Sequence, residues 1–372
     1  WFGRPHLEMT WWHAVDFALW NRPAVVGKML DWYNDVAYPV AAWIASRQGF
    51  DGVRWMKMTD PDAGEAPSNT GSFLIWQQPH YIYMAEEMYR ANPDDATLDR
   101  YGEQVEATAA FMADYARACA PKGKGTIRLF GHTAMQESMS KDFSCNHPFE
   151  LAYWRYGLEK AQQWRERRGL QRHKEWDDII ARLSPLPQRD GVYVAGEPVK
   201  KFDNSKRGNA GFDPYVAAAQ KGASSISEAD FLVKCKSDHP AVLGACGLLP
   251  DMGHYDRAIM ERTLDSVFAD WNWDSTWGWD YGMIAMCAAR LGRPETAVDA
   301  LLIDKGKNTY LVSGHNFQEP KRLRLYLPGN GSLLDAVAMM CAGWDGCKGV
   351  RNPGFPADGT WNVRWEGLRR MQ

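Results

Sequence analysis

Three carboxylates stand where aromatic and polar residues lead into an expected helix. Glu137 lies in "GHTAMQESM", and Asp274 and Asp280 lie in "WNWDSTWGWDYG". A carboxylic acid among Met, Phe and Tyr side chains can be desolvated enough to stay protonated near neutral pH, while a second, ionised carboxylate acts as a base. These residue types predict general acid–base chemistry, with Glu137 as the candidate acid. Asp274 fits an N-cap equally well, so its role stays open at this point.

Aromatic residues are frequent and are interleaved with polar ones. The chain has 18 Trp, 15 Tyr and 14 Phe, and many of the tryptophans stand beside Asp, Glu, Asn or His, as in "MTWWH" and "IWQQPH". An indole stacks on the CH face of a sugar while polar neighbours bond the hydroxyls, so this pattern favours a carbohydrate pocket over a simple aromatic core. The candidate substrate-binding residues are His6, Glu8, Trp11, Trp12, Arg54, Trp55, Lys57, Trp76, Gln77, His80, Trp277, Trp279, His315 and Asn316.

The elements that must position these residues are predicted to be amphipathic helices. Apolar residues recur every three to four positions, and acids or Pro open several first turns. The expected helices are Trp12–Lys28, Leu30–Arg47, Leu74–Tyr89, Ala96–Ala118, Pro148–Arg168, Trp176–Leu183, Asp213–Gln220, Ser227–Lys234, Ala241–Leu248, Asp256–Asp270, Tyr281–Leu291, Glu295–Leu302 and Leu333–Gly343. Short strands are expected at Gly125–Phe130, Gly191–Gly196 and Leu323–Gly329. Alternating short and long loops without a fixed-period repeat predict a mainly all-α fold, an (α/α)6 toroid of paired helices with a few short strands in loops.

We expect residues 1–372 to form a single catalytic domain. Residues 185–236 are richer in Gly, Lys and Ser, and they are predicted to form an elaborated loop region over one end of the barrel. The chain opens "WFGRPHLEM" without an initiator Met, which indicates a fragment of a longer chain.

Composition argues against several classes of function. The net charge is -3, which gives no electrostatic footprint for nucleic acid. No apolar run approaches the roughly 20 residues that span a bilayer. Seven Cys are present without a CxxC pair or zinc pattern, so we expect buried free thiols, no metal and no cofactor. The expected partner is a small-molecule oligosaccharide.

Four motifs, in this order, resemble the catalytic (α/α)6 barrel of inverting glycoside hydrolases, the clan that holds the α-L-fucosidases and the maltose and kojibiose phosphorylases. "DGVRWMKMTDPDAGEAPS" is similar to a family loop of form G-A-R-W/Y-P, and "AMQES" stands where the phosphorylases have G-P-D-E. "WDSTWGWDYGMIAMCAARLG" is similar to a fucosidase segment that ends in "ARLG", and "LPGNGSLLDAVAMMCAGWDG" resembles their "GGLLQAVAEML" helix. The likeness spans nearly the whole chain.

This resemblance implies an exo-acting, inverting glycoside hydrolase. Glu137 matches the family's general acid, Asp274 its general base, and Asp280 is the alternative base should the register shift. The fucosidases hold the attacking water with an Asn-x-Asn pair, but here "RPHLEM" fills that segment. The departure allows Glu8 or His6 to take part in activating water.

Other functions stay open from the sequence. A disaccharide phosphorylase would need phosphate for cleavage, a catalytically inactive carbohydrate-binding barrel would bind without releasing sugar, and a polysaccharide lyase would give an unsaturated product. An extracellular or periplasmic location is implied by the family resemblance alone.

Overall fold

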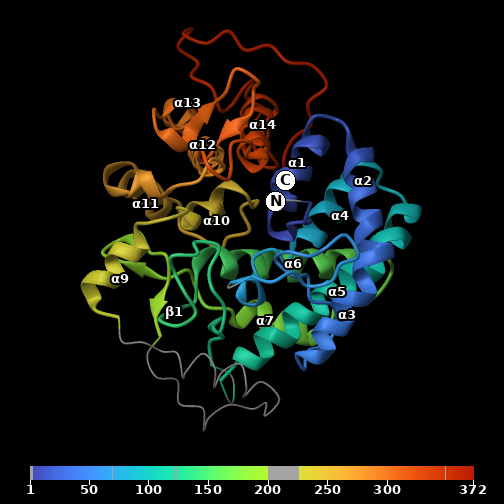
Figure 1. The fold of residues 1–372 in the computed structure, drawn as a ribbon. Helices are drawn as coiled ribbons and strands as arrows, with labels where there is room; N and C mark the ends of the chain where they lie inside the picture. The colour runs from blue at the N-terminus through green and yellow to red at the C-terminus, as the bar shows by residue number, and fades with distance from the viewer. Residues whose placement is uncertain (1–2, 69, 122, 124, 200–225, 348) are drawn as a thin grey trace.

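The computed structural model describes residues 3–68, 70–121, 123, 125–199, 226–347 and 349–372 (Figure 1). These residues form a mainly helical body with three short two-stranded sheets at its edges. No helix among them combines the length and apolar character that crossing a membrane requires. All seven cysteines are free, and all but Cys347 are buried, as the sequence predicts.

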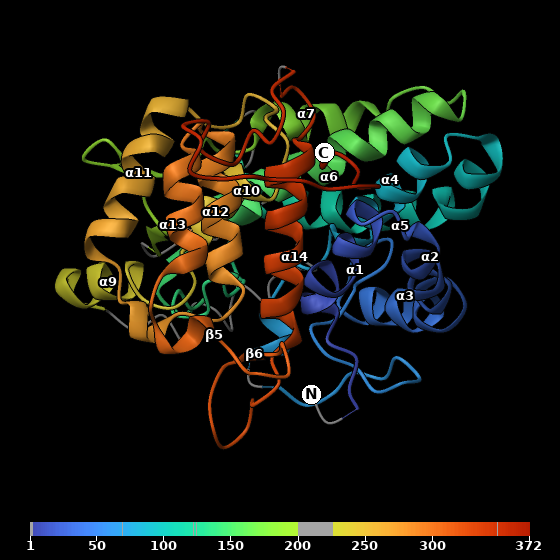
Figure 2. The ribbon, with the colours of Figure 1, turned by 90° about the horizontal axis from the view of Figure 1, so that it is seen from above.

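Six helices form an inner ring (Figures 1 and 2). Each contacts the next in chain order, and the last contacts the first, so the ring closes. The inner helices are α1 (Thr10–Leu19), α4 (His80–Ala91), α6 (Pro148–Arg167), α10 (Gly244–Gly247, preceded by the 3-10 turn Ala241–Leu243), α12 (Asp280–Arg290) and α14 (Leu327–Ala342). The (α/α)6 prediction is confirmed.

Outer helices return the chain between successive inner ones. They are α2 (Pro23–Trp32), continued through the π-helical turn Tyr33–Ala37 into α3 (Tyr38–Arg47), then α5 (Asp95–Cys119), α7 (Lys174–Arg182), α11 (Arg257–Asp270) and α13 (Pro294–Leu302). Local sequence sets their starts: the Asp94 and Asp256 side chains accept hydrogen bonds from the backbone N–H groups of Thr97 and Ile259. Since each outer helix reverses the chain, the inner helices all begin at one end of the ring.

Several helix boundaries differ from the predicted ones for local reasons. The predicted helix Trp12–Lys28 is split into α1 and α2, because Asn21 has a positive φ of 58° and Pro23 opens a new helix. The predicted helix Leu74–Tyr89 begins only at His80, after Pro79. The helix expected at Leu333–Gly343 begins earlier, at Leu327, and therefore replaces the end of the strand expected at Leu323–Gly329.

The strand predictions hold in one of three places. Gly125–Phe130 makes only an isolated bridge, between Ile127 and Leu183. Val192–Tyr193 forms β3, which pairs antiparallel with β2 (Gln188–Arg189). The remaining pairs are β1 (Ser144–Cys145) with β4 (Glu197–Pro198) and β5 (Thr309–Tyr310) with β6 (Asn316–Phe317).

Residues 185–236 are described only in part. They contribute β2, β3, β4 and α9 (Glu228–Cys235), whereas the helix predicted at Asp213–Gln220 lies outside the described residues. The reading of this region as an elaborated loop, and of residues 1–372 as one domain, stays a prediction.

The contact between α1, α12 and α14 depends on two glycines. A Cβ added at Gly331 would lie 1.6 Å from the backbone oxygen of Trp12, and one added at Gly282 would lie 2.2 Å from Oγ of Ser332. At these positions the helices approach more closely than any side chain permits. The ring therefore closes through backbone contact, where α14 meets α1.

We expect Gly331→Ala to destabilise the protein by about 1–3 kcal/mol or more, because the new methyl group overlaps a backbone atom that cannot turn aside. Thermal and urea unfolding measure the effect. Gly306→Ala is the matched control, because a Cβ at Gly306 would meet nothing within 4 Å. An equal unfolding midpoint for the two variants would contradict this account of ring closure.

Candidate active site

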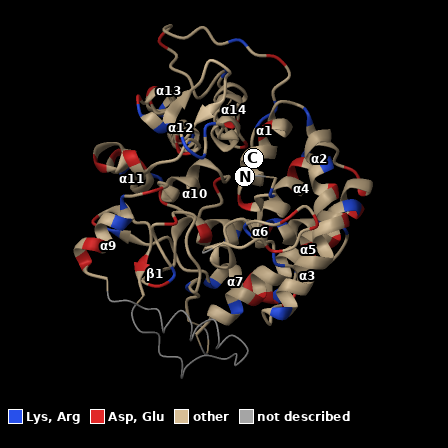
Figure 3. Ribbon diagram, in the orientation of Figure 1, with Lys and Arg blue, Asp and Glu red and all other residues tan. Residues whose placement is uncertain are grey.

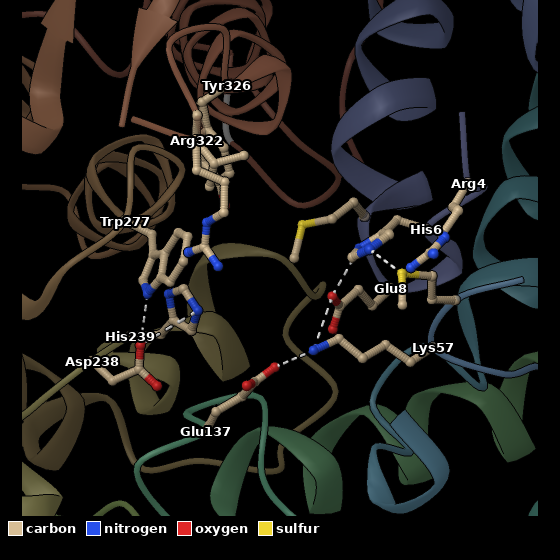
Figure 4. Close-up of a pocket in the computed structure, with 13 residues that line it drawn as sticks. Arg4, His6, Glu8, Lys57, Glu137, Asp238, His239, Trp277, Arg322 and Tyr326 are labelled. Carbon is tan, nitrogen blue, oxygen red and sulfur yellow. Dashed lines mark hydrogen bonds and ion pairs between the residues drawn. The ribbon is translucent and has the colours of Figure 1, made fainter. Parts of the chain in front are cut away.

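A cavity of about 440 Å³ opens at the end of the ring where the inner helices begin (Figure 4). It is lined by segments that precede inner helices or lie in the loops between them. The lining residues are Arg4, His6, Glu8, Met9, Lys57, Met58, Glu137, Asp238, His239, Trp277, Arg322, Leu323 and Tyr326. Helix N-termini carry partial positive charge, so this end of the ring favours carboxylates and other anions.

Lys57 joins two carboxylates on one wall of the cavity. Its Nζ donates to Oε1 of Glu137 at 2.6 Å and lies 3.4 Å from Oε1 of Glu8. Glu8 also contacts Nδ1 of His6 at 3.1 Å. Burial would lower the pKa of Lys57, but the charges of Glu8 and Glu137 raise it, so the ammonium ion persists. Glu8 is thus held between two basic groups.

Glu137 is the more exposed of the two carboxyl groups, with 37% of its side chain accessible. Desolvation in the pocket and the nearby Glu8 carboxylate raise its pKa, and Lys57 offsets part of that rise. Its loop is fixed by its neighbours: Gln136 Nε2 donates to the carbonyls of Lys234, Cys235 and Ser237, and the Ser138 N–H donates to Asp238. The candidate acid therefore stands on a firmly held loop.

The opposite wall is built around His239. Its Nδ1 donates to Oδ1 of the fully buried Asp280 at 2.8 Å, and its Nε2 lies 3.7 Å from Oδ1 of Asp238. Asp238 also accepts from the Trp277 indole N–H at 2.9 Å. Burial would lower the pKa of His239, but the two carboxylates raise it to about 9. His239 is therefore an imidazolium ion at neutral pH.

The Trp279 ring packs against the face of the His239 imidazolium, on the side away from the cavity. Its ring is stacked on His239 at a centroid distance of 4.0 Å, and Trp12 and Trp76 stack in turn on Trp279, at 5.1 and 6.3 Å. A cation against an aromatic face is favourable in a desolvated setting. The three tryptophans form a layer behind the cavity wall.

The role predicted for five tryptophans needs correction. Their side chains are buried, with at most 2% accessible, and none lines the cavity. They are Trp11, Trp12, Trp55, Trp76 and Trp279. The inward face of each helix or loop packs them against the core, so no ring face is left for a sugar. Trp277 alone among the predicted tryptophans lines the cavity.

The position of Asp274 does not suit the base predicted for it. Asp274 is exposed in the 3-10 turn Trp273–Ser275 and does not line the cavity. Asp280, the alternative, is fully buried behind His239 and accepts hydrogen bonds from His239 and from the Trp277 backbone. Burial raises the pKa of Asp280, and the His239 charge opposes this. Asp280 therefore orients the His239 ring and raises the pKa of His239, and it does not line the cavity.

Three further residues that were predicted to bind substrate form hydrogen bonds with loop backbone instead. Arg54 donates to the Leu74 carbonyl, and Gln77 donates to the carbonyls of Trp55 and Leu74. Asn316 is fully buried and donates to the carbonyls of Lys307 and Thr309. Each satisfies backbone carbonyls that the long loops leave without helical partners.

The two predicted histidines outside the cavity differ from each other. His80 Nε2 donates to the backbone carbonyl of Glu8 at 3.0 Å, and burial lowers its pKa to about 3, so a neutral His80 holds Glu8 in place. His315 is partly buried and lines a separate hollow of about 290 Å³ with His13 and Tyr326. Of the predicted residues, His6, Glu8, Lys57, Glu137 and Trp277 therefore meet in one cavity.

Sequence reasoning missed the residues that complete the opposite wall. Asp238 and His239 lie in "KSDHPAVLG", and Arg322 and Tyr326 precede α14. The sequence signal for Asp238 and His239 is an Asp-His-Pro run directly before a buried apolar helix. This signal is weak, because the stretch before it has little helical character and resembles a surface loop.

We expect Asp280→Asn to lower the pKa of His239 from about 9 to below about 7, because the buried imidazolium loses its closest anion. Histidine NMR titration measures the midpoint. In the wild type, the stability contributed by this raised pKa is fully present below pH 6.5, the ordinary histidine value, and is lost as the pH rises through about 9. Asp274→Asn is the matched control and should leave the midpoint unchanged; an unchanged midpoint in Asp280→Asn as well would refute the ion pair.

Comparison with known proteins bears on the fold. No protein-family model matches the chain, and no curated protein matches it. Among solved structures, it is similar to one titled "Putative kojibiose phosphorylase from human microbiome", with a TM-score of 0.51 and 9% sequence identity. The match covers 83% of this chain and 45% of the other, so this chain spans less than half of that protein's length. The two structures share the ring of paired helices.

Proposed function

We propose that this protein is a carbohydrate-active enzyme that hydrolyses a glycosidic bond, with Glu137 as the general acid. The observation that carries the proposal is the pairing of Glu137, half-exposed and with a raised pKa, with Glu8, a second carboxyl group on the same cavity wall. Glycoside cleavage needs one carboxyl group that donates a proton to the leaving oxygen and another that activates water or attacks carbon.

Glu8 takes the role of base in this proposal. It contacts Lys57 and His6, and its backbone is fixed by His80. The nearest oxygens of Glu8 and Glu137 are 3.4 and 2.6 Å from one Lys57 nitrogen, so they lie no more than 6.0 Å apart. Inverting enzymes separate their carboxyl groups by about 6.5–9.5 Å. An inverting reaction therefore requires the Glu8 and Glu137 carboxyl groups to move apart as the sugar and water enter.

The remaining lining groups suit a sugar ring. Trp277 offers aromatic surface, and Met9 and Leu323 add apolar contact. Asp238 and His239 can bond ring hydroxyls, and Arg4 and Arg322 lie at the exposed rim. A few convergent polar groups on a partly apolar wall are typical of small-ligand pockets.

We expect Glu137→Gln to lower kcat by about 10³-fold on substrates with poor leaving groups, because no proton reaches the leaving oxygen. A panel of oligosaccharides and aryl glycosides measures this, and an activated aryl glycoside should lose much less. Asp274→Asn should keep wild-type turnover. Wild-type turnover by Glu137→Gln would remove Glu137 from the mechanism.

Glu8→Gln is expected to abolish hydrolysis of both activated and unactivated substrates, because the attacking water loses its base. Product NMR on the wild type tests the inverting prediction through the configuration of the sugar first released. Full activity in Glu8→Gln together with its loss in Asp238→Asn would transfer the role of base to the opposite wall.

A phosphorylase is the second candidate, favoured by the cations that line the cavity. The His239 imidazolium, Lys57 and Arg322 face a space that could take phosphate as the attacking group. Cleavage that depends on added phosphate and releases a sugar phosphate would support this reaction over hydrolysis. Oligosaccharide binding by calorimetry without any product would indicate an inactive barrel.

A further inference from the structure

Two histidines and a glutamate meet in the core next to the loop of Glu137. His132 lies in that loop, His147 is the N-cap residue of α6, and Glu150 is in the first turn of the same helix. All three are buried, with at most 1% accessible. One ligand atom from each lies within 4.8 Å of the others, and Nε2 of His132 is 2.9 Å from Nδ1 of His147. None of the three lines the cavity described above.

Each imidazole also contacts a hydroxyl group. Tyr115 donates its only hydroxyl proton to the carbonyl of Phe130 at 2.5 Å, so toward Nδ1 of His132, at 3.3 Å, it offers a lone pair. Nδ1 of His132 therefore carries the ring proton, and Nε2 of His132 presents a lone pair to His147. The Ser144 hydroxyl lies 2.8 Å from the carbonyl oxygen of Ser140 and 3.0 Å from Nε2 of His147, so its single proton can go to either acceptor.

Nε2 of His132 and Nδ1 of His147 are 2.9 Å apart. Two arrangements satisfy such a contact: a hydrogen bond from Nδ1–H of His147 to Nε2 of His132, or a metal ion that both nitrogens bind. Histidines that bind a metal usually donate their other N–H to a hydroxyl, carbonyl or carboxylate oxygen, as His132 does to Tyr115 here.

Glu150 supplies the third donor. Its Oε1 accepts a hydrogen bond from the Met135 N–H at 2.5 Å, whereas its buried Oε2 has no hydrogen-bond partner. An unsatisfied carboxylate oxygen in the core is costly, and a cation would satisfy it. The helix dipole explains an acid in this turn, but it does not explain the second oxygen.

We propose that Nε2 of His132, Nδ1 of His147 and Oε2 of Glu150 bind a buried zinc ion. Two histidines and one glutamate are the donor set of some zinc enzymes, in which a water molecule takes the fourth tetrahedral position, with Zn–N and Zn–O distances of about 2.0–2.2 Å. Two nitrogens on a tetrahedral zinc ion lie about 3.3 Å apart, so the rings need to separate only slightly, while the carboxylate moves inward. The ion ties the 132–135 segment to α6, two residues before the proposed acid Glu137.

Metal analysis of the full chain, purified without a histidine tag, tests the proposal. We expect about one zinc per chain by elemental mass spectrometry, and a visible d–d absorption of tetrahedral type when Co²⁺ replaces it. Removing the zinc with a chelator should lower the melting temperature, and adding Zn²⁺ should restore it. A folded protein that has no zinc as purified and takes up neither ion would overturn the site and leave a hydrogen bond between the two neutral imidazoles as the account of their contact.

Substitutions of the proposed ligands test which residues bind the ion. Glu150→Gln and His147→Asn should lose the bound zinc and the cobalt spectrum, whereas His173→Ala, at an exposed histidine, and Glu137→Gln should keep both. If either ligand variant fails to fold, the cobalt spectrum of the wild type still decides whether nitrogen and oxygen ligands hold the metal. Zinc retained in a folded Glu150→Gln, His147→Asn double variant would refute these ligands. None of these outcomes depends on which reaction the cavity catalyses.

Discussion

The common direction of the six inner helices is the constraint on which the rest of the structure depends. Because each outer helix returns the chain, every inner helix starts at the same end of the ring. The segments before α1, α10, α12 and α14 therefore converge, although the chain from Glu8 to Tyr326 passes through nearly the whole ring. Close contact at Gly331 and Gly282 keeps that convergence tight. Helix N-termini add positive potential, which suits the acids found there.

Charges around the cavity alternate in sign. On one wall Lys57 stands between Glu8 and Glu137, and on the other His239 stands between Asp280 and Asp238. Each of these two cations is shared by two carboxylates, so Glu8, Glu137, Asp238 and Asp280 all have a counter-charge nearby. Acidic and basic residues are otherwise scattered over the described part of the chain, as Figure 3 shows, and only the fold brings these together. Of these four carboxyl groups, Glu137 is the most exposed.

The tryptophans show that the residues beside an indole in the sequence do not decide whether it lines a pocket or fills the core. Trp12, Trp76 and Trp279 form a layer behind the wall, and their effect on the site is indirect, since Trp279 supports His239. An indole next to polar residues in the sequence is compatible with either a pocket or a core. The inner face of the ring is apolar on nearly every helix, so most large aromatic side chains are used to fill it.

The order of residues is enough to predict the helical toroid, most helix boundaries, and five residues of the cavity: His6, Glu8, Lys57, Glu137 and Trp277. The helices follow from the 3.6-residue period and from Pro, Gly and Asp at helix ends. The choice of His6, Glu8 and Glu137 also rests on the resemblance of their segments to glycoside hydrolase motifs. Only the tertiary structure decided that Asp274 is exposed, that Asp280 acts through His239, and that Asp238 completes the second wall. The reason is physical: period and capping are properties of neighbours in the chain, whereas burial and charge pairing arise between segments that meet only when the ring closes.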